Sequence, residues 1–76
     1  MSGRPAKHSV TLKGHRTSVS LEDEFWQAFR EMAFEKQRPI NDLIAEIDVD
    51  RGDTMGLASA IRLYVLRNLQ ERLAGS

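Results

Sequence analysis

Residues 16–21 alternate between polar side chains and side chains that can be buried. The polar set, each member of which can donate a hydrogen bond, is Arg16, Ser18 and Ser20. The intervening set is Thr17, Val19 and Leu21. This alternation predicts a strand with one wet and one buried face. Two such strands, if paired, form a ribbon with one polar face. Arginine can donate two hydrogen bonds to guanine and serine can donate or accept, so we expect this face to read DNA.

Catalytic and metal-binding patterns are missing from the sequence. The chain has no cysteine, and its only histidines, His8 and His15, have no carboxylate close to them in sequence, too few ligands for a zinc site. Ser18 and Ser20 have no base at a recognisable spacing, and no nucleophile elbow or glycine-rich phosphate loop occurs. We therefore expect a protein that is not an enzyme and that uses no metal and no cofactor.

The strand at 16–21 must be paired, because an unpaired strand exposes a row of amide and carbonyl groups. Everything after it is helical in pattern, so we expect an identical strand from a second copy of the chain to pair with it, giving a homodimer. Residues 8–12 form a weaker alternating stretch, and Gly14 supplies a turn between the two. This stretch either forms a local hairpin or adds to the outside of a two-chain ribbon, and the pattern leaves both open.

Three helices are expected after the strand, over residues 23–36, 40–48 and 57–73, with a polar loop at 49–56. Acidic residues open the first helix, and Pro39 suits the first helical position of the second. Helical spacing of apolar residues, together with the alternation of the strand, predicts a shared core. Its expected members are Val19, Leu21, Phe25, Phe29, Leu43, Ile44 and Ile47.

Length and charge bound the assembly. The chain has 76 residues, a size at which one core is marginal and oligomerisation is a common remedy. We expect one domain over residues 8–73, preceded by a flexible basic arm at 1–7. Residues 1–20 hold four basic side chains and no acid, a net charge of +4, whereas residues 21–76 hold seven basic and eleven acidic side chains, a net charge of −4. The basic end favours a nucleic-acid partner, and the lack of a long apolar run favours a cytoplasmic protein without a membrane span.

The order strand, helix, short turn, helix resembles the ribbon-helix-helix family that includes the Arc, MetJ and CopG repressors, which place strands in a groove of DNA. The resemblance covers about residues 16–48 and is closest to the short, single-domain bacterial members. Three runs carry it: Gly14 to Glu22, Glu24 to Trp26, and Asn41 to Ile47. It implies a mainly α fold with a short β-ribbon, an intertwined homodimer and, here, an extra C-terminal helix.

The resemblance also implies roles for individual residues. Base-reading side chains on the outward strand face would be Arg16, Ser18 and Ser20. Phosphate contacts at the start of the second helix would come from the backbone around Ile40 and Asn41, with Arg38 nearby. Apart from the resemblance, Lys13 in the turn is also placed to meet phosphate. Two features depart from the family pattern, because Gln37 and Pro39 replace the usual glycine and the small polar cap between the helices.

The resulting hypothesis is a sequence-specific DNA-binding homodimer, a transcriptional repressor or autoregulator that inserts an antiparallel ribbon into the major groove, with higher assembly on DNA open. The alternative is a small dimeric protein-interaction module without sequence-specific DNA binding. An antitoxin is a third reading, although the chain has no long tail with which to wrap a toxin.

Overall fold

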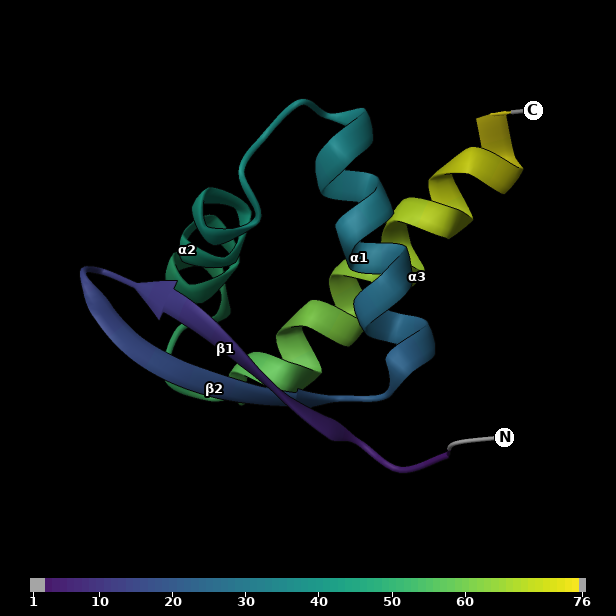
Figure 1. Cartoon of the computed structure of the whole chain (residues 1–76). Coiled ribbons are helices and arrows are strands. Elements are labelled where there is room, and N and C mark those ends of the chain that lie inside the picture. The colour runs from purple at the N-terminus through teal and green to yellow at the C-terminus, as the bar shows by residue number, and fades with distance from the viewer. Residues whose placement is uncertain (1–2, 76) are drawn as a thin grey trace.

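The computed structural model describes residues 3–75 and contains a two-stranded hairpin followed by three helices. The strands are β1 (Ala6–Leu12) and β2 (His15–Leu21), and the helices are α1 (Asp23–Glu35), α2 (Ile40–Arg51) and α3 (Leu57–Gly75). The hairpin lies across one end of the helices, and the C-terminal end of α1 lies away from it (Figure 1). The expected class, mainly α with a short β-ribbon and an extra C-terminal helix, is confirmed.

The hairpin forms within one chain. Lys13 and Gly14 form its two-residue turn with φ angles of 53° and 77°, and two positive φ angles define the turn type whose twist matches that of paired strands. β1 and β2 pair antiparallel along their whole lengths, from Leu12 opposite His15 to Ala6 opposite Leu21. Of the two alternatives left open for residues 8–12, the structure shows the local hairpin, so the strand at 16–21 has a partner in its own chain.

β1 includes two residues that were expected in the N-terminal arm. Ala6 and Lys7, expected in a flexible arm, are strand residues that pair with Leu21 and Ser20. They belong to the strand because the alternation of β1 begins at Ala6, two residues before the predicted start at residue 8. Residues 1 and 2 of the expected arm lie outside the described part of the chain.

The core lies between the inner face of the hairpin and the three helices. Its buried side chains are Val10, Val19, Leu21, Phe29, Met32, Ala33, Leu43, Ile44, Ile47, Ala60, Ile61 and Val65. Aromatic contacts link three elements: His8 of β1 stacks on Trp26 at 4.2 Å, and Phe29 meets Tyr64 of α3 edge-on at 6.0 Å. Because side chains from the hairpin, α1, α2 and α3 all enter this one cluster, the hairpin is fixed to the helices by packing.

One expected core residue and one residue of the expected inner strand face differ in the structure. Phe25 packs against the core but is only half-buried, and the Arg62 guanidinium lies 5.9 Å from its ring centre. Thr17 shares the inner face of the hairpin with Val19 but is exposed.

The junctions between helices explain the other departures. Gln37 has a φ of 56°, and the amides of Gln37 and Arg38 bond to the carbonyls of Phe34 and Ala33, at 3.0 Å each. This is the standard left-handed ending of a helix, which glycine usually occupies. Pro39 is the N-cap of α2, one position before the place we expected.

α2 continues to Arg51, three residues beyond the expected end at 48. The Arg51 guanidinium bonds to Asp48 at 2.7 Å and to the Met55 carbonyl at 2.6 Å, which stabilises the extra turn. Gly52, with a φ of 66°, then ends the helix. The loop expected at 49–56 is correspondingly shorter. Within residues 3–75 no helix is both long and apolar enough to cross a membrane.

Candidate nucleic-acid interface

One face of the hairpin points away from the core and is entirely polar. Residues directly opposite each other across an antiparallel pair share a face, and three such pairs face outward: Lys7 with Ser20, Ser9 with Ser18, and Thr11 with Arg16. Five of these side chains are exposed and Thr11 is half-buried. We call this set of six residues the outer hairpin face. It contains the three expected base-reading residues, Arg16, Ser18 and Ser20, and an equal number from β1.

The charge of the outer hairpin face is positive. Lys7 and Arg16 are its only charged side chains, and neither has an ion-pair partner within residues 3–75. The outward-facing hydroxyls of Ser9, Ser18 and Ser20 lie between them. Such a surface can hydrogen-bond to base edges or phosphates and attracts a polyanion.

The two expected phosphate-binding cations have acidic partners instead. The Lys13 Nζ lies 3.7 Å from Oδ2 of Asp48, and the Arg38 guanidinium forms an ion pair with Glu46. Both acids belong to α2, whose start is the expected phosphate site. Lys13 or Arg38 can therefore bind phosphate only by sharing its charge or exchanging its partner.

These ion pairs shift the pKa values of the groups that form them. The hydrogen bond between Arg38 and Glu46 raises the pKa of the Arg38 guanidinium above its ordinary value. The hydrogen bond from Arg51, with a smaller contribution from Lys13, lowers the pKa of the Asp48 carboxyl. Both shifts favour the charged forms at neutral pH.

The start of α2 is tied to the hairpin. Oδ1 of Asn41 accepts a hydrogen bond of 3.1 Å from the amide of Thr11, which occupies the outer edge of β1 at that point. The donors that Asn41 offers a phosphate are its backbone amide and its side-chain nitrogen, since the side-chain oxygen only accepts. The Pro39 carbonyl accepts from the amides of Asp42 and Leu43, at 3.1 and 3.2 Å, and no side chain caps the helix. The amides of Ile40 and Asn41 remain as the donors at this helix end.

The free edge of β2 differs from that of β1. Backbone groups of an antiparallel strand point alternately toward the partner strand and away from it. The Thr11 amide bonds to Asn41 and therefore points away from β2. Arg16 lies opposite Thr11, so its backbone groups point away from β1 in the same way. By alternation, the backbone groups of Ser18 and Ser20 also face the open side of β2. Arg62 of α3 reaches the Ser20 carbonyl at 3.5 Å and bonds to Glu22 at 2.8 Å. The backbone groups of Arg16 and Ser18 are left at an open strand edge.

Sequence reasoning missed half of the outer hairpin face. Lys7 was expected only within the basic arm, whose position beside DNA was left open, and Ser9 and Thr11 were not expected to belong to the site, although a signal for these two existed. Ser9 and Thr11 alternate with Val10 and Leu12 just as the polar residues of β2 alternate with its buried ones. The alternation identified the face but could not show which strand lay beside it.

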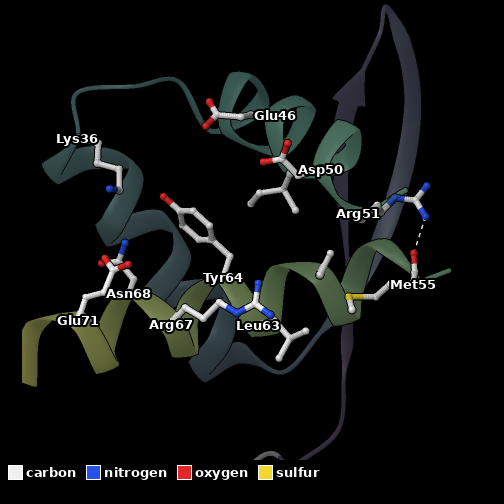
Figure 2. A pocket seen from close by; sticks show the side chains of 12 residues that line it. Lys36, Glu46, Asp50, Arg51, Met55, Leu63, Tyr64, Arg67, Asn68 and Glu71 are labelled. Atoms are coloured by element: carbon white, nitrogen blue, oxygen red, sulfur yellow. Dashed lines mark hydrogen bonds between the residues drawn. The ribbon is translucent and has the colours of Figure 1, made fainter. Parts of the chain in front are cut away.

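A separate hollow of about 460 Å³ lies between α2, α3 and the end of α1, as Figure 2 shows. The hydroxyl of Tyr64 points into it. Its charged rim is balanced, with three basic and three acidic side chains: Lys36, Arg51, Arg67, Glu46, Asp50 and Glu71. Such a rim has no net attraction for a charged ligand. Among the described residues, no group of three or more potential metal-binding side chains occurs.

Comparison with known proteins gives one match. A family model described as a ribbon-helix-helix domain matches residues 5–69, which include the hairpin, α1, α2 and most of α3. No curated protein matches the chain, and no solved structure does.

Proposed function

Because the chain belongs to the ribbon-helix-helix family, we propose that it binds double-stranded DNA sequence-specifically as a homodimer and acts in the cytoplasm as a repressor or autoregulator. The family consists generally of DNA-binding transcription regulators and antitoxins. The observation that carries the proposal is the outer hairpin face, because it is polar, positively charged and free of acidic side chains.

In this proposal β2 reads the bases. Arg16 donates to the acceptors of a guanine, and Ser18 and Ser20 bond to neighbouring base edges. The exposure of all three and the absence of an ion-pair partner for Arg16 within residues 3–75 support these roles. The major groove is wide enough for a two-stranded ribbon. Serine discriminates bases less than arginine does, so two half-sites would be needed for specificity.

Lys13, Arg38 and the backbone amides of Ile40 and Asn41 contact phosphate in the same proposal. The amides lie at the start of α2, where the helix dipole favours an anion. The Arg38 side chain begins bonded to Glu46, so its contribution depends on opening that pair.

The cost of opening that pair can be tested directly. Glu46→Gln removes the acidic partner, and we expect it to strengthen binding to cognate and scrambled duplexes alike, by about two- to fivefold at low salt, because exposed ion pairs are weak. Fluorescence anisotropy with both duplexes measures this. Glu31→Gln is the matched control, since Glu31 is exposed on α1 and has no ion-pair partner among the described residues. Equal affinities of Glu46→Gln and wild type would show that the Arg38–Glu46 pair does not oppose DNA binding.

The homodimer is proposed from two exposed features. The open edge of β2 offers the backbone groups of Arg16 and Ser18, and an identical strand related by a two-fold axis would bond to them. On α3, Leu66 and Leu69 are 47% and 43% exposed and follow Arg62 at helical spacing. Since Arg62 bonds to the Ser20 carbonyl, these leucines share the side of the molecule on which β2 is open.

We expect the folded state to depend on this dimer. The thermal midpoint should rise with protein concentration, because association stabilises the folded chain by mass action. Differential scanning fluorimetry over a hundredfold concentration range tests this expectation, with sedimentation velocity as the independent measurement. A folded monomer at micromolar concentration would contradict it.

The function itself is tested by selection from a random DNA pool with purified protein. We expect an enriched motif with two half-sites, bound more tightly than a scrambled duplex and with strong salt dependence. If no duplex binds, the alternative of a dimeric interaction module takes its place.

A further inference from the structure

We infer that β1 is a phosphate-binding strand: Lys7 Nζ and Ser9 Oγ contact the DNA backbone beside the base-reading residues of β2. This inference rests on the proposed function and adds residues that neither the strand pattern nor the start of α2 supplies. The two strands of one chain then have different roles: β2 contacts the bases, and β1 contacts the phosphates that border the major groove.

The register places both residues on the correct face. Lys7 lies opposite Ser20, and Ser9 lies opposite Ser18. Directly opposite side chains in an antiparallel pair are about 4.5–5.5 Å apart at their Cβ atoms. DNA that contacts Ser18 and Ser20 is therefore one strand spacing from Ser9 and Lys7. Both β1 residues are exposed, so their side chains are accessible to it.

The distance between strands selects phosphate rather than base edges for β1. A second copy that pairs along the open edge of β2 would give the strand order β1, β2, β2, β1. Strands in a sheet are about 4.8 Å apart, so the two outer strands would be separated by roughly 14 Å. The major groove is about 12 Å wide. The two copies of β2 would then lie over the bases, and each β1 would lie at a groove wall, where the phosphates are.

The ion pairs support the same assignment. A phosphate would compete with Asp48 and Glu46 for Lys13 and Arg38, whereas Lys7 has no acidic partner within residues 3–75. Lys7 can therefore bind phosphate without breaking an ion pair. Ser9 adds a hydroxyl donor of the kind that commonly bonds to phosphate oxygens.

The experiment measures affinity for cognate and scrambled duplexes across a salt series. We expect Lys7→Ala to weaken both duplexes by the same factor and to reduce the slope of log affinity against log salt by about 0.9 per chain. Lys36→Ala, which removes the same charge from the C-terminal end of α1 away from the hairpin (Figure 1), should leave the slope unchanged. Thermal unfolding of each variant verifies that it is folded.

A second variant tests Ser9. Ser9→Asp places a negative charge against the proposed phosphate, and we expect it to weaken both duplexes more than about tenfold. Gln70→Glu adds the same charge at an exposed position of α3 and should weaken binding far less.

The outcomes separate this inference from the proposed function. If Lys7→Ala and Ser9→Asp bind like wild type while Arg16→Ala loses its preference for the cognate duplex, β1 is not a DNA contact and the proposed function stands. If Lys7→Ala loses affinity for the cognate duplex alone, Lys7 reads a base and the phosphate assignment is wrong. If wild type binds no duplex, the proposed function fails and the inference fails with it.

Discussion

Phe29→Ala is expected to lower the free energy of unfolding by about 3–5 kcal/mol, the usual cost of truncating a buried phenylalanine. Phe29 has no exposed surface and is among the largest fully buried side chains of residues 3–75. Its ring lies 6.3 Å from that of Trp26 and 6.0 Å from that of Tyr64, so the cavity would open between α1 and α3. Domains are commonly stable by only about 5–15 kcal/mol, and the variant would be largely destabilised.

Urea unfolding followed by circular dichroism measures this effect, at one fixed protein concentration so that dimerisation does not enter the comparison. Phe34→Ala is the matched control, because Phe34 lies on the same helix but is 84% exposed. The control should change stability by no more than about 0.5 kcal/mol. A loss below about 1 kcal/mol in Phe29→Ala would mean that the site can collapse around the smaller side chain.

Arg16→Ala is expected to cost about 1–3 kcal/mol of binding free energy on the cognate duplex and to relax the preference at one base pair in each half-site. The reason is that direct contacts to base edges carry sequence information, whereas phosphate contacts do not. Arg16 is exposed on the outer hairpin face, so its truncation leaves the core intact.

The measurement compares cognate, single-mismatch and scrambled duplexes at one salt concentration. Arg30→Ala serves as the control, since it removes an exposed arginine of α1 that has no ion-pair partner among the described residues. Equal weakening of all duplexes by Arg16→Ala would identify Arg16 as a backbone contact. Unchanged affinity would remove the outer hairpin face from the proposed interface.

The pairing of β2 shows how a correct pattern can leave a partner strand undecided. Alternation over residues 16–21 predicts two faces, and Val19 and Leu21 are buried as it requires. The partner strand depends on a turn: Lys13 and Gly14 both adopt positive φ angles, and this closes the hairpin within the chain. The argument for a dimer consequently moves from an unpaired strand to the one edge of β2 that remains open.

The cations show a similar division. Lys13 and Arg38 were assigned to phosphate because of their places beside a turn and a helix start. Their acidic partners, Asp48 and Glu46, are 35 and eight residues away in sequence. The approach of α2 to the hairpin turn brings Asp48 to Lys13, whereas Glu46 follows Arg38 within the first two turns of α2. Lys7 was assigned to a flexible arm, yet it is a strand residue and has no such partner within residues 3–75.

The sequence by itself determined what depends on neighbours along the chain. Alternation marked Arg16, Ser18 and Ser20 as one face, and helical spacing marked Phe29, Leu43, Ile44 and Ile47 as core, because side-chain direction follows from local backbone geometry. Tertiary structure alone decided that β1 lies beside β2, that Asn41 bonds to the edge of β1, and which cations are neutralised. The contacts of Asn41 with Thr11 and of Lys13 with Asp48 join residues that are distant in sequence, so they depend on how α2 packs against the hairpin. The hairpin and the Arg38–Glu46 pair span shorter stretches of chain, but the side-chain pattern does not specify the turn conformation or the ion-pair partner.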